Sequence, residues 1–288
     1  MIILTQKTGL NELDYNRVNT NFKTKNMTKL DDFSSKIKIF LYVLFYLKHL
    51  DNVGELKILR NNLPERQQAI LEDKNSGFTF CVDRNGGLGI ISIKYFEPEV
   101  YKFMLLVRGD IFIDIGANVG GYSILNSPRF KKIIAVEPGT KQLELLNKNI
   151  KLNNIGNIEV MSCAIAEEAG IKKLYKTKDL VNYSIAHKGK EYEEITAITL
   201  DKLLDNYSQV ELLKIDVEGA ELEVIKSGLS KINRVHFIVF EIRDLFMDKI
   251  LKMLGEKKFD SFVLEDCAGN KEKNILFINR NYESNKPV

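Results

Sequence analysis

From about residue 100 onward, the chain alternates short apolar runs with segments whose apolar residues recur at helical spacing. The apolar runs predict seven strands, at residues 111–114, 133–137, 157–163, 212–216, 235–241, 259–264 and 274–278. Helical spacing predicts helices at residues 121–130, 142–152, 221–229 and 245–254. This alternation is typical of an α/β fold with a mostly parallel sheet and helices on both faces. The turn between the last two runs is too short for a parallel crossover, so the last strand is expected to be antiparallel.

The N-terminal part of the chain has a different pattern. Residues 1 to about 32 are polar and are expected to form a weakly structured lead-in. Residues 33–50 look helical. Pro64 and the following residues 65–71 predict a second, short helix with the proline at its start.

A β-hairpin is expected next, and it closes this region. Residues 78–82 and 88–93 read as two strands, and the turn signal Asp83-Arg84-Asn85-Gly86-Gly87 separates them. The expected division of the chain is therefore a helical and β-hairpin extension at residues 1–95, followed by the α/β domain at residues 96–288.

Residues 170–199 interrupt the alternation between the third and fourth strands. They are polar, with extended pieces expected at residues 171–175 and 195–199. Ligands bind at the carboxyl edge of open α/β sheets, and this excursion leaves the sheet near that edge. It is a candidate lid or substrate loop, and a plain surface hairpin is the alternative.

The first predicted strand ends in Asp114 and continues into a glycine-bearing turn that contains Gly116, Asn118 and Gly120. A dinucleotide fingerprint needs G-x-G-x-x-G, but here Asp114 occupies the place of the first glycine. A carboxylate there would repel a pyrophosphate and suits a cationic or hydroxyl-bearing ligand. S-adenosylmethionine carries a sulfonium, an ammonium and a ribose diol, so the loop favours that cofactor. Glu137, 23 residues later at the end of the second strand, can accept hydrogen bonds from both ribose hydroxyls.

Two further strands also end in acids, Asp216 and Glu241. Acids at four strand ends indicate a site at one edge of the sheet. Asp216 could bind the amino group of the methionine moiety or orient a substrate hydroxyl. Glu218 and Glu221 follow Asp216 into a helix, where the helix dipole gives Glu221 an alternative, structural reason to be acidic.

These motifs resemble the FkbM-type family of class I S-adenosylmethionine-dependent methyltransferases. The specific part is Lys214-Ile215-Asp216-Val217-Glu218-Gly219-Ala220-Glu221, and the resemblance runs from about residue 110 to residue 242. It implies the seven-stranded, Rossmann-like methyltransferase sheet and O-methylation of a sugar or polyketide hydroxyl.

The resemblance also implies roles for individual residues. Asp114, Gly116, Asn118 and Gly120 would form the cofactor loop, with Glu137 on the ribose. Cys163 and Ala164 would lie along the adenine. Many class I enzymes hold the adenine amino group with an acid near this point, but here Glu167 and Glu168 lie further along the chain.

Methyl transfer to a hydroxyl gains from a general base. Asp216, Glu218 or Glu241 is the hypothesised base or hydroxyl-positioning group, and His187 in the candidate lid is an alternative base. The carboxylates could instead hold a divalent ion, but no dedicated ligand spacing is present, and no metal is expected. Two other functions compete: a nicotinamide-dependent oxidoreductase, and a non-catalytic binding module on a methyltransferase-like scaffold.

Composition narrows the partners and the compartment. The 42 basic and 39 acidic residues leave a net charge of +3, so no global field points to nucleic acid. Three widely spaced cysteines suit a reducing compartment, and no signal peptide is recognisable, so a cytoplasmic protein is expected. The apolar run within residues 37–50 is too short to span a bilayer and predicts either a core helix or a peripheral membrane contact. The expected acceptor is a small molecule, a glycan or a glycolipid.

Overall fold

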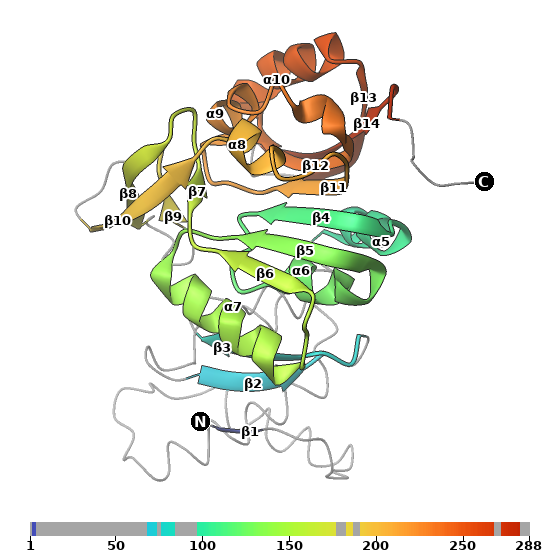
Figure 1. Cartoon of the computed structure of the whole chain (residues 1–288). Helices are drawn as coiled ribbons and strands as arrows, with labels where there is room; N and C mark the ends of the chain where they lie inside the picture. Colours follow the sequence, from blue (N-terminus) through green and yellow to red (C-terminus); the bar gives the residue numbers. More distant parts are fainter. Residues whose placement is uncertain are drawn as a thin grey trace, which may run out of the picture.

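The computed structural model describes residues 2–3, 68–73, 76–83, 97–176, 183–186, 191–267 and 272–282. A seven-stranded sheet forms its centre (Figure 1). Its strands are β4 (Gly109–Ile115), β5 (Phe130–Val136), β6 (Ile158–Met161), β11 (Val210–Ile215), β12 (Val235–Arg243), β13 (Phe259–Cys267) and β14 (Glu272–Asn279). Their spatial order is β13-β14-β12-β11-β4-β5-β6. Strand β14 is antiparallel to both of its neighbours, and the other pairings are parallel. The predicted fold class is confirmed.

Helices cover both faces of this sheet, because side chains along each strand alternate between two apolar clusters. The helices are α5 (Pro98–Leu106), α6 (Gly121–Asn126), α7 (Thr140–Leu152), α8 (Leu200–Leu204), α9 (Glu221–Lys226) and α10 (Asp244–Glu256), with 3-10 turns at Ser127–Arg129 and Ile232–Arg234. Ile113 and Ile134 pack with α8, α9 and α10. Their neighbours Phe112 and Ile133 pack on the opposite face with α5 and α6.

A second, four-stranded sheet lies at the carboxyl ends of the central strands (Figure 1). Its strands are β7 (Ala164–Ile165), β8 (Gly170–Lys176), β9 (Tyr183–Ser184) and β10 (Tyr192–Ile198), in the order β7-β10-β8-β9. Leu174 and Ile195 are buried in its own small apolar cluster. The two extended pieces predicted in this excursion are confirmed as β8 and β10.

The N-terminal region differs from the prediction. The short helix predicted over residues 65–71 is wrong: β2 (Gln68–Glu72) is a strand that pairs antiparallel with β3 (Thr79–Asp83) and parallel with β1 (Ile2–Ile3). Ile70 is buried against Cys81, Val119 and Leu145, so tertiary packing overrides the local helical signal. The helix at residues 33–50, its proposed membrane contact at residues 37–50, and the returning strand at residues 88–93 lie outside the described residues.

Strand β3 lies against α7 of the α/β domain. Asn149 on α7 accepts a hydrogen bond from Cys81 N at 2.6 Å and donates one to Val119 O at 2.9 Å. Asn153 exchanges two hydrogen bonds with the backbone of Thr79. The small sheet is thereby tied to the helix that follows β5, while the division at residue 95 stays a prediction. None of the described helices is long and apolar enough to cross a bilayer.

Candidate active site

A cavity of about 350 Å³ opens at the carboxyl ends of the central strands. Nine of the residues predicted from the sequence line it: Asp114, Gly116, Asn118, Glu137, Cys163, Ala164, Asp216, Glu218 and Glu241. Gly120 is the exception. It begins α6 with a φ of 92°, and a Cβ there would lie 2.6 Å from Leu146 Cδ1, so this glycine faces the core.

Gly116 allows two loops to meet at the base of the cavity. Its φ is 81°, and a Cβ at this position would lie 1.8 Å from the backbone oxygen of Asp216. Asp216 N donates to Ile115 O at 3.0 Å, which holds the two loops in this contact. Only glycine fits here, because both the left-handed backbone and the close approach exclude a side chain.

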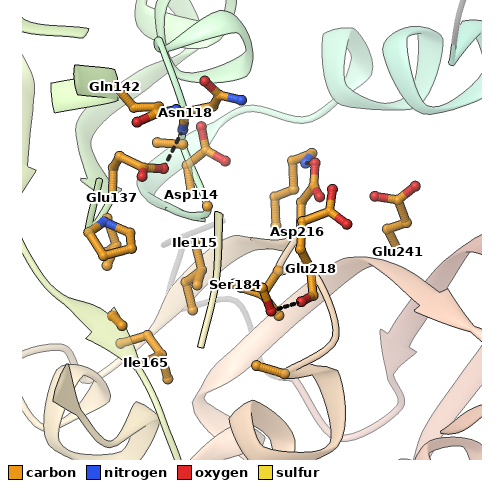
Figure 2. Close-up of a pocket in the computed structure, with 18 of the residues that line it drawn as sticks. Asp114, Ile115, Asn118, Glu137, Gln142, Ile165, Ser184, Asp216, Glu218 and Glu241 are labelled. Atoms are coloured by element: carbon orange, nitrogen blue, oxygen red, sulfur yellow. Dashed lines mark hydrogen bonds and ion pairs between the residues drawn. The ribbon is translucent and has the colours of Figure 1, made fainter. Parts of the chain in front are cut away.

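Glu137 organises the cofactor loop through both carboxylate oxygens. Asn118 N donates to Oε2 at 2.9 Å (Figure 2), and Gly139 N donates to Oε1 at 2.8 Å. Asn118 itself has a φ of 52°, which turns its amide toward the glutamate. Burial raises the pKa of Glu137 to about 7, although the two backbone N–H groups oppose this rise. Each oxygen keeps a further lone pair for a ligand hydroxyl.

Three buried side-chain oxygens beside Glu137 have no hydrogen-bond partner within the described part of the chain: Asp114 Oδ1, Asn118 Oδ1 and Gln142 Oε1. Ser123 Oγ donates to the other oxygen of Asp114 at 2.6 Å. A buried acceptor without a donor costs about 1–3 kcal/mol. Because all three residues line the cavity, ligand hydroxyl or ammonium groups are the donors that this wall fits. These acceptor oxygens therefore fit the ribose hydroxyls and the amino group of S-adenosylmethionine.

The next part of the cavity wall is apolar. Cys163, Ala164 and Ile165 line it from one side, and Leu174 of β8 and Ile185, which follows β9, line it as well. Such a slot fits a flat aromatic ring. Glu167, the nearest acid in sequence, does not line the slot and pairs with Lys226 at 3.3 Å.

Acids gather at the opposite side of the cavity, where Figure 2 shows Asp216, Glu218 and Glu241 apart from Glu137. Lys214 Nζ lies 2.8 Å from Asp216 Oδ2 and 4.7 Å from the centre of the Tyr122 ring. Burial raises the pKa of Asp216, but the charge of Lys214 and the hydrogen bonds from Glu241 and Lys214 together outweigh burial, so the pKa of Asp216 is lowered. The negative charge of Asp216, together with burial, raises the pKa of Glu241 well above its usual range. These opposite shifts in pKa favour the ionised form of Asp216 and the protonated form of Glu241, which is hydrogen-bonded to it.

Glu218 has a different partner. Arg243 Nη2 lies 2.8 Å from Glu218 Oε2, and Arg243 Nε lies 3.1 Å from Glu272 Oε1. Burial, followed by the charge of Asp216, raises the pKa of Glu218 to about 7. Ser184 of β9 donates to the backbone oxygen of Glu218 (Figure 2), which joins the four-stranded sheet to this wall. Glu221 lies outside the cavity and accepts from Gly219 N at 2.9 Å at the start of α9.

Comparison with known proteins agrees with this geometry. The model of the methyltransferase FkbM domain matches residues 114–261, just over half of the 288 residues. The chain belongs to the FkbM methyltransferase family.

Individual relatives in the family are distant. Methyltransferase sdnD of Sordaria araneosa is 28% identical over 168 residues, a match that covers 46% of this chain and 65% of that protein. The match therefore spans less than two-thirds of that relative. Hexuronic acid methyltransferase AglP of Haloferax volcanii is 24% identical over 170 residues, covering 57% of this chain and 70% of the relative. The solved structure of methyltransferase FkbM from Methylobacillus flagellatus has a TM-score of 0.45 at 16% identity, covering 66% of this chain and 53% of that one.

Three residues beside the acids were not assigned a role from the sequence. Lys214 is a charged residue inside an apolar strand, and that signal could have identified it. Tyr122 and Glu97 carry no such signal. Tyr122 donates its hydroxyl hydrogen to Glu97 Oε2 at 2.6 Å, and Asn274 Nδ2 donates to Glu97 Oε1 at 3.0 Å. The FkbM match begins at residue 114, so Glu97 reaches the cavity from outside it.

The remaining candidates lie elsewhere. His187, the alternative base, is outside the described residues. His236 stacks between Phe237 and Tyr282 and does not line the cavity. Within the described ranges, no group of three or more His, Cys, Asp or Glu side chains is arranged to hold a metal ion.

Proposed function

We propose that this chain is an S-adenosylmethionine-dependent methyltransferase that methylates a hydroxyl of a sugar or glycoconjugate. One observation carries the proposal. Six carboxyl side chains line the cavity, and Lys214 is the single basic side chain among the described residues that do so: the acids are Glu97, Asp114, Glu137, Asp216, Glu218 and Glu241. The pKa of Glu241 favours its neutral form, but the other carboxyl groups still outnumber the single basic side chain, and this excess of acids favours a cationic cofactor.

The acid-rich lining separates this proposal from a nicotinamide-dependent oxidoreductase. A dinucleotide would bring a doubly charged pyrophosphate to the turn after β4, where Asp114 replaces the first glycine of the fingerprint. S-adenosylmethionine has no phosphate and supplies an activated methyl group on a sulfonium. Glu137 would bind the ribose, Cys163 and Ala164 would flank the adenine, and Asp114 and Asn118 would receive the donors of the amino-acid end.

The acceptor would approach from the side of Asp216 and Glu241. Asp216 is held ionised by Lys214, so it can accept the proton of an attacking hydroxyl as that oxygen becomes nucleophilic. Glu241, protonated beside it, would hold Asp216 in place through its own hydrogen bond. Glu218, held by Arg243, would orient the acceptor. Sugar hydroxyls suit such a site because they both donate and accept hydrogen bonds.

The proposal is supported by the family and, for a sugar acceptor, by the name of the distant relative AglP. Transfer of a labelled methyl group from S-adenosylmethionine to a panel of glycans and lipids tests it. We expect label in a hydroxyl-bearing glycan or glycolipid, and none with an Asp216→Asn variant. Cofactor binding without transfer to any class of acceptor would instead favour the non-catalytic module.

A further inference from the structure

Among the residues that the structure describes, the cations beside the acceptor end of the cavity already have carboxylate partners. Lys214, with a side chain that is 3% exposed, is paired with Asp216. Arg243 lies behind the wall and pairs with Glu218 and Glu272. Neither cation is available to neutralise a negatively charged group of an incoming acceptor without losing a partner.

Carboxyl groups from separate elements surround the same space. Glu97 precedes α5, Glu241 belongs to β12 and Asp216 follows β11. The charge of Glu97 acts on both Lys214 and Glu241, so these groups lie within one electrostatic neighbourhood. An anionic acceptor would be placed against the negative charges of Glu97 and Asp216, and like charges in close apposition weaken binding.

Glu97 is well placed to interact with an acceptor rather than only with the protein. Tyr122 and Asn274 each supply one hydrogen bond, to opposite oxygens of its carboxylate. A carboxylate has about four acceptor positions, so Glu97 keeps lone pairs for donors in the cavity. The two protein donors fix the direction of the group, and neutral hydroxyls are donors that it can bind without charge repulsion.

We propose that the acceptor end selects a neutral polyhydroxyl acceptor and rejects a carboxylate-bearing one such as a uronic acid, with Glu97 as a specificity-determining residue. This inference rests on the proposed function and narrows its acceptor to one chemical class, which differs from the hexuronic acid in the name of the distant relative AglP. It assigns Glu97 a role in acceptor choice and none in proton transfer.

Two ligands that differ at one carbon test the inference. Methyl β-D-glucopyranoside carries a hydroxymethyl group at C5, and methyl β-D-glucopyranosiduronic acid carries a carboxylate there. Binding of each to the full chain, saturated with S-adenosylhomocysteine, is measured by ligand-observed NMR titration at neutral pH. We expect the neutral glycoside to bind at least about tenfold more tightly than the uronic acid.

The Glu97→Gln variant removes one charge while keeping a side chain that can bond to Tyr122. We expect this variant to reduce the ratio of the two dissociation constants, uronic acid over neutral glycoside, by about tenfold. Glu99→Gln is the matched control, because Glu99 lies two residues further on α5, is half-exposed and pairs with Lys102 away from the cavity. It should leave the ratio unchanged. A narrowed ratio in both variants would mean that general charge, rather than Glu97, sets the preference, and would overturn its assigned role.

Equal or tighter binding of the uronic acid overturns the inference, and so does the absence of binding by both glycosides. These outcomes differ from a failure of the proposed function. That failure appears earlier, as a lack of S-adenosylhomocysteine binding when the cofactor is titrated into the same preparation before any glycoside is added.

Discussion

Lys214 Nζ and Asp216 Oδ2 lie 2.8 Å apart at the end of β11, and the lysine side chain is buried while the aspartate opens into the cavity. The spacing follows from strand geometry, because residues two apart in an extended chain project to the same face. The pair favours the ionised form of Asp216, which is the form that can accept a proton from a hydroxyl.

Substitution of the two coupled acids should therefore have unequal effects. Asp216→Asn removes the ionised acceptor and should lower kcat by about 10²–10⁴. Glu241→Gln should lower kcat by less than about tenfold, because the amide still donates a hydrogen bond as the protonated acid does. Steady-state methyl transfer measures both values, with S-adenosylmethionine affinity as the check on site integrity. A larger loss for Glu241→Gln than for Asp216→Asn would contradict this assignment.

Glu137 should make the stability of the ligand-free protein depend on pH. Burial raises its pKa from 4.5 to about 7, so between these values the folded state holds a proton that the unfolded state releases. The contribution of this group to stability is complete below pH 4.5 and is lost as pH rises through 7, by about 3 kcal/mol. Denaturant unfolding from pH 4.5 to 8 should show that the unfolding free energy of the unsubstituted chain falls by this amount relative to that of the Glu137→Gln variant.

The exposed Glu144 on α7 provides the control for that experiment. Glu144→Gln should follow the unsubstituted chain across the whole range. A constant difference between the unsubstituted chain and Glu137→Gln at every pH would contradict the assigned cause.

The free-energy cost of placing a side chain in the close contact between Gly116 and Asp216 can be measured separately from the cost of backbone strain. Gly77 has a similar φ of 75° but has nothing within 4 Å of an added Cβ. Gly77→Ala should cost about 1–2 kcal/mol of unfolding free energy from strain alone. Gly116→Ala should cost about 1–3 kcal/mol more, because its Cβ meets the Asp216 backbone. Equal losses in the two variants, measured by denaturant unfolding, would show that the close approach contributes nothing.

Asn149 should hold the N-terminal strands on the α/β domain. Asn149→Ala leaves Cys81 N and Val119 O without their partner, and each buried group should cost about 1–3 kcal/mol. Hydrogen exchange at the Cys81 amide should accelerate accordingly. Asn147→Ala is the control, because Asn147 is exposed and its side chain donates to Leu143 O of its own helix. Unchanged exchange at Cys81 in Asn149→Ala would contradict this role.

Most of the central sheet could be predicted because its strands are apolar on both faces. Residues such as Ile133 and Ile134 contact opposite layers, and only a covered parallel strand accommodates that pattern. Strand β2 could not be predicted, because the burial of Ile70 depends on Val119 and Leu145, which are distant in sequence.

The site residues also divide into those that follow a local sequence pattern and those that depend on contacts between distant parts of the chain. Asp114, Glu137 and Asp216 could be predicted because each ends an apolar run, and strand ends meet at one edge of the sheet. Glu97 could not, because it follows no motif and reaches Tyr122 and Asn274 only through the packing of α5. Gly120 was predicted to face the ligand, but a glycine motif alone does not distinguish ligand contact from close packing against Leu146.

The central claim is that the cavity binds S-adenosylmethionine, and calorimetric titration of the full chain tests it most directly. We expect saturable binding of S-adenosylmethionine at one site per chain, no comparable binding of NAD, and an affinity loss of at least about tenfold in Glu137→Ala, which removes a charged hydrogen-bond acceptor. Binding of NAD in preference to S-adenosylmethionine, or S-adenosylmethionine binding that Glu137→Ala leaves unchanged, would contradict the account.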